Sequence, residues 1–215
     1  MSLKLYDYFR SSAAFRVRIA LNYKDLAYES VSKKLREGQH RAADYRALNP
    51  QALVPALDDD GTVIPQSVAI IEYLEEKHPA PPLLPRGAAE RALVGSMALA
   101  VACDVHPLNN LRVLNFLQLP LGIDRSVVEK TWITHWIAEA FSGLERQARK
   151  ASADQRHMFG SSVTMADVFI VPQMYNAKRF GCDIAPYPTL TAICAHLESL
   201  PPFARAMPEV QPDAT

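Results

Sequence analysis

The chain has 215 residues, enough for one or two domains with a hydrophobic core of ordinary size. Its 23 Lys and Arg residues balance its 23 Asp and Glu residues, so net charge does not favour nucleic acid or an anionic membrane as a partner. A hydrophobic fraction of 49% with only 8 glycines excludes a disordered or fibrous chain. Three cysteines are too few for a disulfide framework, and free thiols favour a cytoplasmic protein.

No part of the sequence predicts a signal peptide or a membrane span. The first eight residues contain charge and no apolar run, so we read them as the start of a strand. The longest apolar stretch, residues 97–103, falls far short of the roughly 18 residues that cross a bilayer. We therefore expect no membrane partner.

Residues 1–77 alternate short apolar runs with helical patterns. We expect strands at 3–6, 28–31, 54–57 and 62–65, and helices at 13–22, 36–48 and 66–77. The run Asp58-Asp59-Asp60-Gly61 is typical of a tight turn between antiparallel strands. This order predicts an α/β domain over residues 1–77.

A proline-rich segment marks the expected domain boundary. Residues 78–85 contain four of the 16 prolines, which favours an extended connector, and we place a linker at 78–87. Beyond it, residues 88–215 show helical periodicity and predict an all-helical domain. Thr164 and Asp167 have the spacing of a capping box, and the apolar run that follows predicts a helix buried at the centre of this domain.

Several common site types are missing from the sequence. It contains no glycine-rich dinucleotide or P-loop motif and no Gly-x-Ser-x-Gly motif. Its six histidines are not spaced as metal ligands with one another or with cysteine, so we expect no metal site.

Ser11 and Ser12 follow the first expected strand directly and begin a helix. One interpretation is an ordinary helix cap, in which a serine hydroxyl accepts a hydrogen bond from a backbone N–H. The other is a site for an anion or a thiolate, because a helix N-terminus and a hydroxyl both stabilise negative charge. A serine at Gln66-Ser67 also begins a helix after a strand, and two such sites suggest a ligand with separated anionic groups, such as glutathione.

The dipeptide Val54-Pro55 also allows two interpretations. It can be the start of an edge strand, where a proline is tolerated. Alternatively, a cis peptide bond can turn the Val54 backbone outward to pair with an extended peptide ligand.

Segments over nearly the whole length of the sequence match the pattern of a known family. They are residues 11–21, 48–50, 54–55, 66–76, 106–114, 164–167, 171–173, 176–180, 187–189 and 211–213. In these segments the sequence resembles the zeta-class glutathione transferases, a class that includes maleylacetoacetate isomerases and to which maleylpyruvate isomerases are close. The resemblance implies a thioredoxin-like N-terminal domain that binds glutathione and an all-helical C-terminal domain that supplies much of the second-substrate pocket, with a cleft between them.

The resemblance also assigns roles to individual positions. It implies that Ser11 stabilises the glutathione thiolate, that Gln66 and Ser67 bind the γ-glutamyl carboxylate, and that Val54, followed by Pro55, pairs with the cysteinyl backbone. The other residues that it places around glutathione are Ser12, the backbone of Ala13, Ala14, Phe15 and Arg16, and also His40, His106, Asn110, Leu111 and Arg112. His40 occupies the place of a glutamine in the family.

The implied reaction is glutathione-dependent cis–trans isomerisation of maleylacetoacetate in tyrosine and phenylalanine breakdown, by thiolate addition, bond rotation and elimination. Its substrate is a small dicarboxylate, and arginines suit both the carboxylates and the developing negative charge. Arg10, Arg112 and Arg179 are the candidates, and Arg10 and Arg179 are the expected catalytic pair together with Ser11 and Ser12. The resemblance further implies a homodimer.

One residue departs from the family pattern, because Ala13 stands where a cysteine usually follows the two serines. The mechanism above needs no protein thiol, and the departure leans toward the maleylpyruvate branch. Three alternatives stay open: a maleylpyruvate isomerase of gentisate breakdown, a zeta-class transferase that acts on small halo-acids, and a non-catalytic binding module with the same fold.

Overall fold

The computed structural model describes residues 3–214, which divide into two compact units. The first unit combines the residues up to Leu83 with those from Leu200 onward, and the second runs from Leu84 to Ser199. Among the described residues, no helix is both long enough and apolar enough to cross a membrane.

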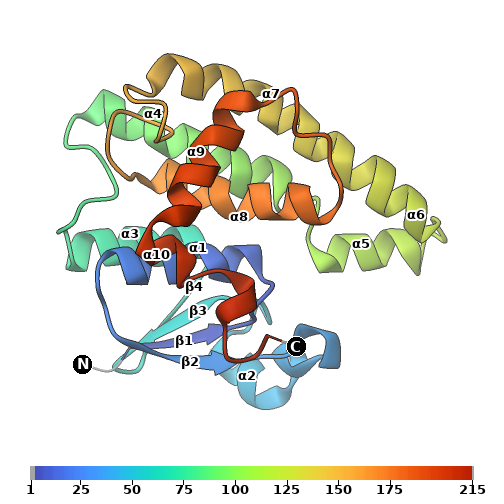
Figure 1. The fold of residues 1–215 in the computed structure, drawn as a ribbon. Coiled ribbons are helices and arrows are strands. Elements are labelled where there is room, and N and C mark those ends of the chain that lie inside the picture. Colours follow the sequence, from blue (N-terminus) through green and yellow to red (C-terminus); the bar gives the residue numbers. More distant parts are fainter. Residues whose placement is uncertain (1–2, 215) are drawn as a thin grey trace. The chain divides into compact units, whose positions relative to one another are not determined.

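A four-stranded mixed sheet forms the framework of the first unit (Figure 1). Its strands are β1 (Leu3–Asp7), β2 (Tyr28–Ser32), β3 (Ala56–Asp59) and β4 (Thr62–Pro65), in the order β2-β1-β3-β4. β1 pairs in parallel with β2 and antiparallel with β3, which places Leu5 between Ser30 and Leu57. Leu5 and Leu57 are fully buried, as expected for the central strands of a covered sheet.

Three helices complete the βαβ–ββα order of this unit. They are α1 (Ser12–Tyr23), α2 (Ala43–Leu48) and α3 (Ser67–Lys77). α1 and α3 lie along one face of the sheet and α2 lies on the other side (Figure 1). The predicted thioredoxin-like domain is therefore confirmed.

Two details of this unit differ from the sequence expectation. The stretch 36–48 forms two short 3-10 turns, Leu35–Glu37 and Gln39–Arg41, before α2, because Gly38 adopts a φ of 74° that ends the first turn. Residues 54 and 55 precede β3 instead of opening it, and the bond between them is cis.

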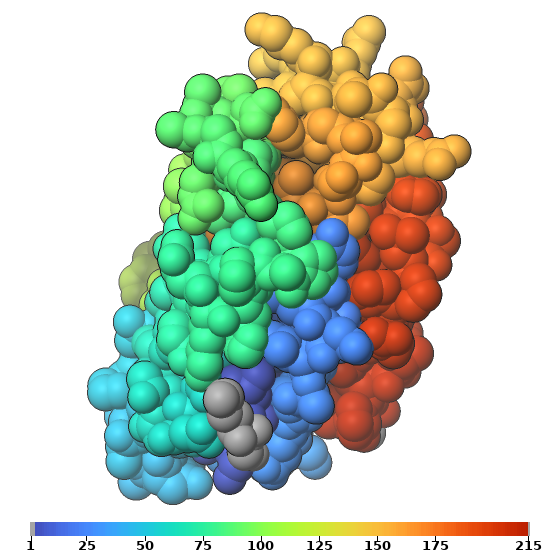
Figure 2. Space-filling model, turned by 90° about the vertical axis from the view of Figure 1, so that its left-hand side faces the viewer, coloured from blue at the N-terminus to red at the C-terminus, as the bar shows by residue number. Residues whose placement is uncertain are grey.

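The end of the chain belongs to the first unit, which corrects the expected helical domain of 88–215. Asn22 Nδ2 donates to the Pro202 carbonyl oxygen at 3.0 Å, and Arg18 Nε donates to that of Ala206 at 3.0 Å. α10 (Pro201–Ala204) packs against α1, and Phe203 and Ala206 are fully buried. In the space-filling view, the red C-terminal residues lie directly against blue residues of the N-terminal part (Figure 2). The unit boundary falls between Leu83 and Leu84, inside the expected linker.

The second unit is built from helices. They are α4 (Ala88–Leu99), a π-helical turn (Ala100–Val105), α5 (Leu111–Gln118), α6 (Arg125–Val127), a second π-helical turn (Val128–Trp132), α7 (Ile133–Ala151), α8 (Met165–Arg179) and α9 (Pro188–Ser199). Apart from one isolated bridge between Ser152 and Gly160, residues 84–199 contain no β-structure. Turns at residues 106–110 separate the first π-helical turn from α5.

α8 forms the buried centre of this unit, as predicted. Residues 168–171 have no exposed surface, and both α4 and α9 pack against the helix. The capping box is present, because the Thr164 side chain accepts from the Asp167 N–H and Asp167 Oδ2 accepts from the Thr164 N–H at 2.7 Å; the Thr164 hydroxyl also donates to Oδ2, at 2.8 Å. Burial raises the pKa of Asp167 to about 6, against the opposing effect of the hydrogen bonds from Met158 and Thr164.

Candidate active site

Ser11 is the N-cap of α1, at the junction with the loop that leaves β1. Its backbone is extended (φ −72°, ψ 113°), and its Oγ accepts a hydrogen bond from the Ala14 N–H at 3.2 Å. The cap interpretation is therefore confirmed. Because Oγ accepts this bond, the hydroxyl proton can be donated to an anion at the positive end of the helix.

The residues after Ser11 contribute mainly through their backbone. Ser12 opens the helix and, like Ala14 and Phe15, is buried in the first unit. The Phe15 N–H already donates to the Ser11 carbonyl oxygen at 2.8 Å. The Ala14 and Phe15 N–H groups are thus both bonded to Ser11, one to its hydroxyl and one to its carbonyl oxygen.

Arg10 lies in the loop just before Ser11 and is half-buried. Its guanidinium carbon lies 4.7 Å from the centre of the Phe9 ring. Its Nε is buried and has no hydrogen-bond partner within residues 3–214. A buried donor of this kind suits an anionic ligand that the chain itself does not supply.

A second candidate anion site lies at the start of α3. Gln66, the residue before the helix, has φ 74° and ψ 119°, a conformation that is costly for a residue with a side chain. Its Nε2 donates to Gln51 Oε1 at 2.6 Å, which joins the start of α3 to the loop before β3. Backbone strain of this kind is concentrated at ligand-binding positions.

Arg16 brings positive charge to the same place. Its side chain is 1% exposed, and Nη1 donates to Ser67 Oγ at 3.3 Å. A guanidinium next to a helix N-terminus produces a positive local field, which suits a carboxylate. The family resemblance implied only a backbone role for Arg16, and the structure adds this side-chain contact.

The peptide bond between Val54 and Pro55 has the isomer named in the second of the two interpretations. The Val54–Pro55 bond is cis, and neither the N–H nor the C=O of Val54 is hydrogen-bonded within the described part of the chain. The preceding carbonyl is held firmly, because Asn49 Nδ2 and the Tyr45 hydroxyl both donate to Leu53 O, at 2.8 and 2.7 Å. Burial raises the pKa of Tyr45 to about 12, so its hydroxyl remains a donor at neutral pH.

His40 lies in the second 3-10 turn and is 8% exposed. Burial lowers the pKa of His40, and the nearby charges of Arg41 and Arg46 lower it further. Both effects favour the neutral form of the ring. Its Nδ1 has no hydrogen-bond partner within residues 3–214 and can face a polar ligand.

The other residues that the resemblance places around glutathione belong to the second unit. Asn110 caps α5, with its Oδ1 accepting from the Arg112 N–H at 3.1 Å, while Leu111 and Arg112 are exposed on the first turn of the helix. His106 is half-buried just after the first π-helical turn. Asn109, which the sequence pattern did not indicate as a site residue, has both polar atoms of its side-chain amide buried without a partner among the described residues.

Arg179 is the last residue of α8 and is exposed. Its guanidinium carbon lies 4.9 Å from the centre of the Phe180 ring. The capping box fixes the other end of the same buried helix, so Arg179 projects from a rigid element. Arg179 and residues 106–112 are part of the second unit, whereas Arg10, Ser11, His40, Val54 and Gln66 are part of the first.

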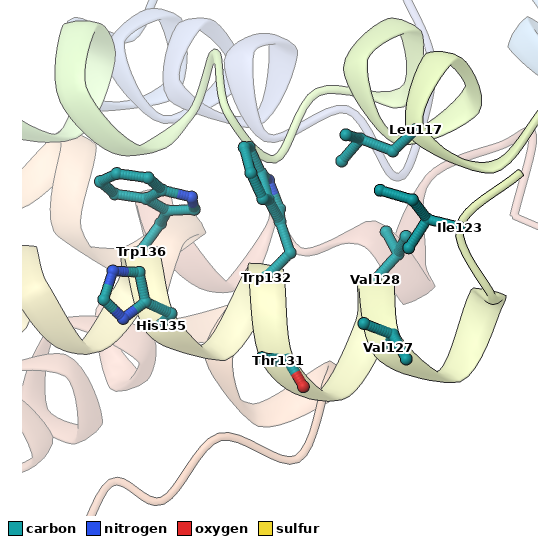
Figure 3. A pocket seen from close by; sticks show the side chains of 8 residues that line it. All are labelled: Leu117, Ile123, Val127, Val128, Thr131, Trp132, His135 and Trp136. Carbon is teal, nitrogen blue, oxygen red and sulfur yellow. The ribbon is translucent and has the colours of Figure 1, made fainter. Parts of the chain in front are cut away.

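A pocket of about 230 Å³ in the second unit contains none of the predicted site residues (Figure 3). Its lining consists of Leu117, Ile123, Val127, Val128, Thr131, Trp132, His135 and Trp136. Trp132 Nε1 donates to the Leu108 carbonyl oxygen at 2.9 Å, and the Trp132 and Trp136 rings meet edge to face. This mostly apolar lining does not suit a dicarboxylate.

Metal ligands do not gather anywhere in residues 3–214, where no group of three His, Cys, Asp or Glu side chains could hold an ion.

Comparison with known proteins identifies the relatives of this chain. The model of the glutathione S-transferase N-terminal domain matches residues 1–76. A probable maleylacetoacetate isomerase of Vibrio cholerae is 50% identical over 217 residues, covering 100% of this chain and 99% of the relative.

Solved structures give the same result. A holo structure of maleylpyruvate isomerase, described as a bacterial zeta-class glutathione S-transferase, superposes with a TM-score of 0.95 at 41% identity and covers 100% of both chains. A maleylacetoacetate isomerase of Methylobacterium extorquens AM1 with bound malonate and glutathione superposes with a TM-score of 0.94 at 40% identity, and the alignment covers 99% of each chain.

Proposed function

This chain belongs to the zeta class of the glutathione S-transferase family, and we propose that it is a glutathione-dependent isomerase that converts maleylacetoacetate to fumarylacetoacetate. The observation that carries the proposal is Ser11, which caps α1 and keeps a hydroxyl proton for an anion at the helix N-terminus. Such a proton can stabilise a thiolate and so lower the pKa of a bound thiol.

The residues of the first unit fit glutathione at three separate points. The strained Gln66 and the hydroxyl of Ser67, backed by Arg16, suit the γ-glutamyl carboxylate. The outward backbone of Val54 can pair with the cysteinyl unit, as an added strand pairs with a sheet edge. Ser11 then faces the sulfur, with His40 as a neutral polar neighbour of the site.

When bound, glutathione supplies the thiolate whose addition makes the cis double bond single, allows rotation and leaves a trans double bond after elimination. Residues of the chain stabilise the negative charge that develops during these steps. Ser11 donates a hydrogen bond to the sulfur whenever it is anionic, and Arg10 supplies a guanidinium for a substrate carboxylate and for the negative charge of the adduct. Arg179 and Arg112 are the corresponding candidates in the second unit.

Turnover tests this proposal directly. Purified protein is mixed with glutathione and maleylacetoacetate, and isomerisation is followed by ultraviolet absorbance. We expect turnover that requires glutathione. Glutathione binding without turnover of any maleyl substrate would reject the isomerase and support a non-catalytic binding module with this fold.

Maleylpyruvate is the second candidate substrate. The observations that favour it are the TM-score of 0.95 to a maleylpyruvate isomerase and the presence of Ala13 at the position after the two serines. Both substrates are dicarboxylates, so the same arginines suit either one. A higher kcat/KM for maleylpyruvate in the same assay would assign the enzyme to gentisate breakdown, whereas a higher value for maleylacetoacetate assigns it to breakdown of phenylalanine and tyrosine.

We also propose that the protein is a cytoplasmic homodimer. The three cysteines are free thiols, which suits a reducing compartment. Leu93 and Leu99 of α4 are 53% and 43% exposed, and apolar side chains of this size are commonly covered in oligomers. Light scattering of the purified protein tests the dimer, and a monomer at micromolar concentration would reject it.

A further inference from the structure

The loop residue Phe9 is held on both sides by charged side chains. Its N–H donates to Asp213 Oδ2 at 3.2 Å, and its carbonyl oxygen accepts from Arg18 Nη2 at 2.9 Å. Phe9 immediately precedes Arg10 and Ser11. The peptide groups on either side of one residue are thus fixed next to the proposed catalytic side chains.

Arg18 is itself immobilised by its remaining donors. Nη1 donates to both carboxylate oxygens of Asp7, at 2.8 and 2.9 Å, and Nε donates to the Ala206 carbonyl oxygen at 3.0 Å. The Arg18 side chain has no exposed surface, and that of Asp7 is 2% exposed. A buried guanidinium with this set of partners has a single orientation, so the Phe9 carbonyl is tied to a rigid point.

Asp213 supplies the second fixed point from the far end of the chain. The oxygen that accepts from Phe9 also accepts from the Ser32 hydroxyl at 2.7 Å, at the end of β2. Gln211 Nε2 donates to the carbonyl oxygens of Arg205 and Met207, at 2.9 and 2.8 Å, which folds the segment carrying Asp213 into a compact turn. The C-terminal segment therefore reaches the loop as an ordered structure.

The orientation of Phe9 affects the position of the Arg10 guanidinium, because the two side chains are in contact. The Arg10 guanidinium lies over the Phe9 ring at 4.7 Å, and the Tyr8 ring packs edge-on against Phe9 with centroids 4.9 Å apart. A shift of the Phe9 backbone would move the surface on which the Arg10 guanidinium rests. Misplacement of a catalytic group by about 1 Å can cost about 10²-fold in rate.

We propose that Asp213 and Arg18 are positioning residues that fix the Phe9–Ser11 segment, so that the C-terminal segment of the chain sets the placement of Arg10 for the dicarboxylate. This inference rests on the proposed isomerase function for its catalytic consequence. Its structural part, restraint of the loop by Asp213, concerns the protein without substrate.

The test uses full-length variants that separate the effect of the hydrogen bonds that Asp213 accepts from the effect of its negative charge. Asp213→Ala removes the acceptor, whereas Asp213→Asn retains one oxygen that can accept from both Phe9 and Ser32. Ser32→Ala removes one of the two bonds that orient Asp213. Asp58→Ala is the matched control, because Asp58 accepts one backbone N–H, that of Gly61, in the β3–β4 turn.

We expect Asp213→Ala to lower kcat/KM for the maleyl substrate by about tenfold while KM for glutathione changes by less than about twofold. We expect Asp213→Asn and Asp58→Ala to behave as the wild type and Ser32→Ala to lie between. A wild-type kcat/KM in Asp213→Ala, or equal losses in Asp213→Ala and Asp213→Asn, would overturn the proposal. Unfolding curves show whether any loss reflects unfolded protein, and if Asp213→Ala does not fold, an unaltered kcat/KM in Ser32→Ala overturns the proposal.

Hydrogen exchange at the Phe9 amide provides a readout that does not depend on turnover. We expect faster exchange in Asp213→Ala than in the wild type and in Asp58→Ala. If the wild type turns over neither maleyl substrate, the proposed function is rejected. Hydrogen exchange at the Phe9 amide would still show whether Asp213 restrains the loop. Unchanged exchange in Asp213→Ala would overturn the restraint whatever the activity.

Discussion

Lys24 Nζ lies 2.7 Å from Glu75 Oε2, and this buried ion pair joins the end of α1 to the last turn of α3. Lys24 also donates to the carbonyl oxygens of His78 and Pro81, at 2.7 and 2.9 Å. Glu75 accepts from the Leu83 N–H in return. The pair therefore holds the proline-rich connector, which the sequence predicted only to be extended, against the first unit.

Lys24→Met should destabilise the protein strongly, because it leaves the Glu75 carboxylate buried without its cation. Removing one partner of a buried pair costs about 3–5 kcal/mol. The free energy of unfolding in urea measures the loss. Lys34→Met is the control, because the Lys34–Glu37 pair is about half exposed and should contribute almost nothing. Equal losses in both variants would contradict the role given to Lys24.

Ser11→Ala should lower kcat by about 10²-fold, the usual effect of removing one hydrogen bond to a developing negative charge. The same change removes a helix cap, which costs about 1 kcal/mol of stability. Ser11→Asn separates the two effects, since asparagine caps helices well and has no hydroxyl. We expect Ser11→Asn to be stable and inactive.

Cys103→Ala serves as the activity control for Ser11. Cys103 is an exposed thiol on the first π-helical turn, and the proposed mechanism uses no protein thiol. We expect wild-type kcat and KM. Equal rates in Ser11→Ala and Cys103→Ala would mean that the thiolate site lies elsewhere.

Arg179→Lys should raise KM for the dicarboxylate by about tenfold, because a lysine cannot form the two parallel hydrogen bonds of a guanidinium with a carboxylate. KM for glutathione should change little. Arg149→Lys, in the last turn of α7, is the matched control and should have no effect on either KM. A wild-type dicarboxylate KM in Arg179→Lys would remove Arg179 from the site.

Asp167→Asn should destabilise the second unit. The carboxylate accepts from the Met158 N–H and from the N–H and hydroxyl of Thr164, whereas an amide would place an NH₂ group against one of these donors. An unsatisfied buried donor costs about 1–3 kcal/mol. Asp183→Asn, at an exposed carboxylate that accepts one N–H, should be nearly neutral.

The pH dependence of stability gives an independent check on Asp167. Burial raises the pKa of Asp167 to about 6, above the ordinary aspartate value, so the folded protein binds the proton more tightly than the unfolded chain. The contribution of this carboxyl to stability is therefore greatest at acid pH and falls as the pH rises from about 4 to about 6. Over this range, unfolding measurements should show the wild type losing stability relative to Asp167→Asn. An opposite slope would contradict the raised pKa.

Sequence reasoning succeeded where a feature depends on residues close together in the chain. The Ser11 cap and the Thr164–Asp167 capping box were predicted from spacing and are present. The turn at Asp60 and Gly61, both with positive φ, was predicted from residue type. The prediction of a single helix over 36–48 was wrong, because Gly38 ends the first 3-10 turn and only residues 43–48 form an α-helix.

The contacts that complete the site join residues far apart in the chain, and local patterns cannot specify them. Arg16 and Ser67 are one example, and Phe9 and Asp213, separated by 204 positions, are another. The motif containing Asp213 was part of the family resemblance, but its partner could not be derived from sequence. Sequence also left the Val54–Pro55 bond undecided between two interpretations.

By itself, the sequence determined the helix starts that suit anions, the succession of strands and helices along the first unit and the helical nature of the second, because these depend on side-chain periodicity and on hydrogen bonds within a few residues. Only the tertiary structure decided that residues 200–214 return to the first unit and that Asp213 and Arg18 hold the loop before Ser11. Those contacts depend on packing, which brings distant parts of the chain close enough for buried polar groups to satisfy one another.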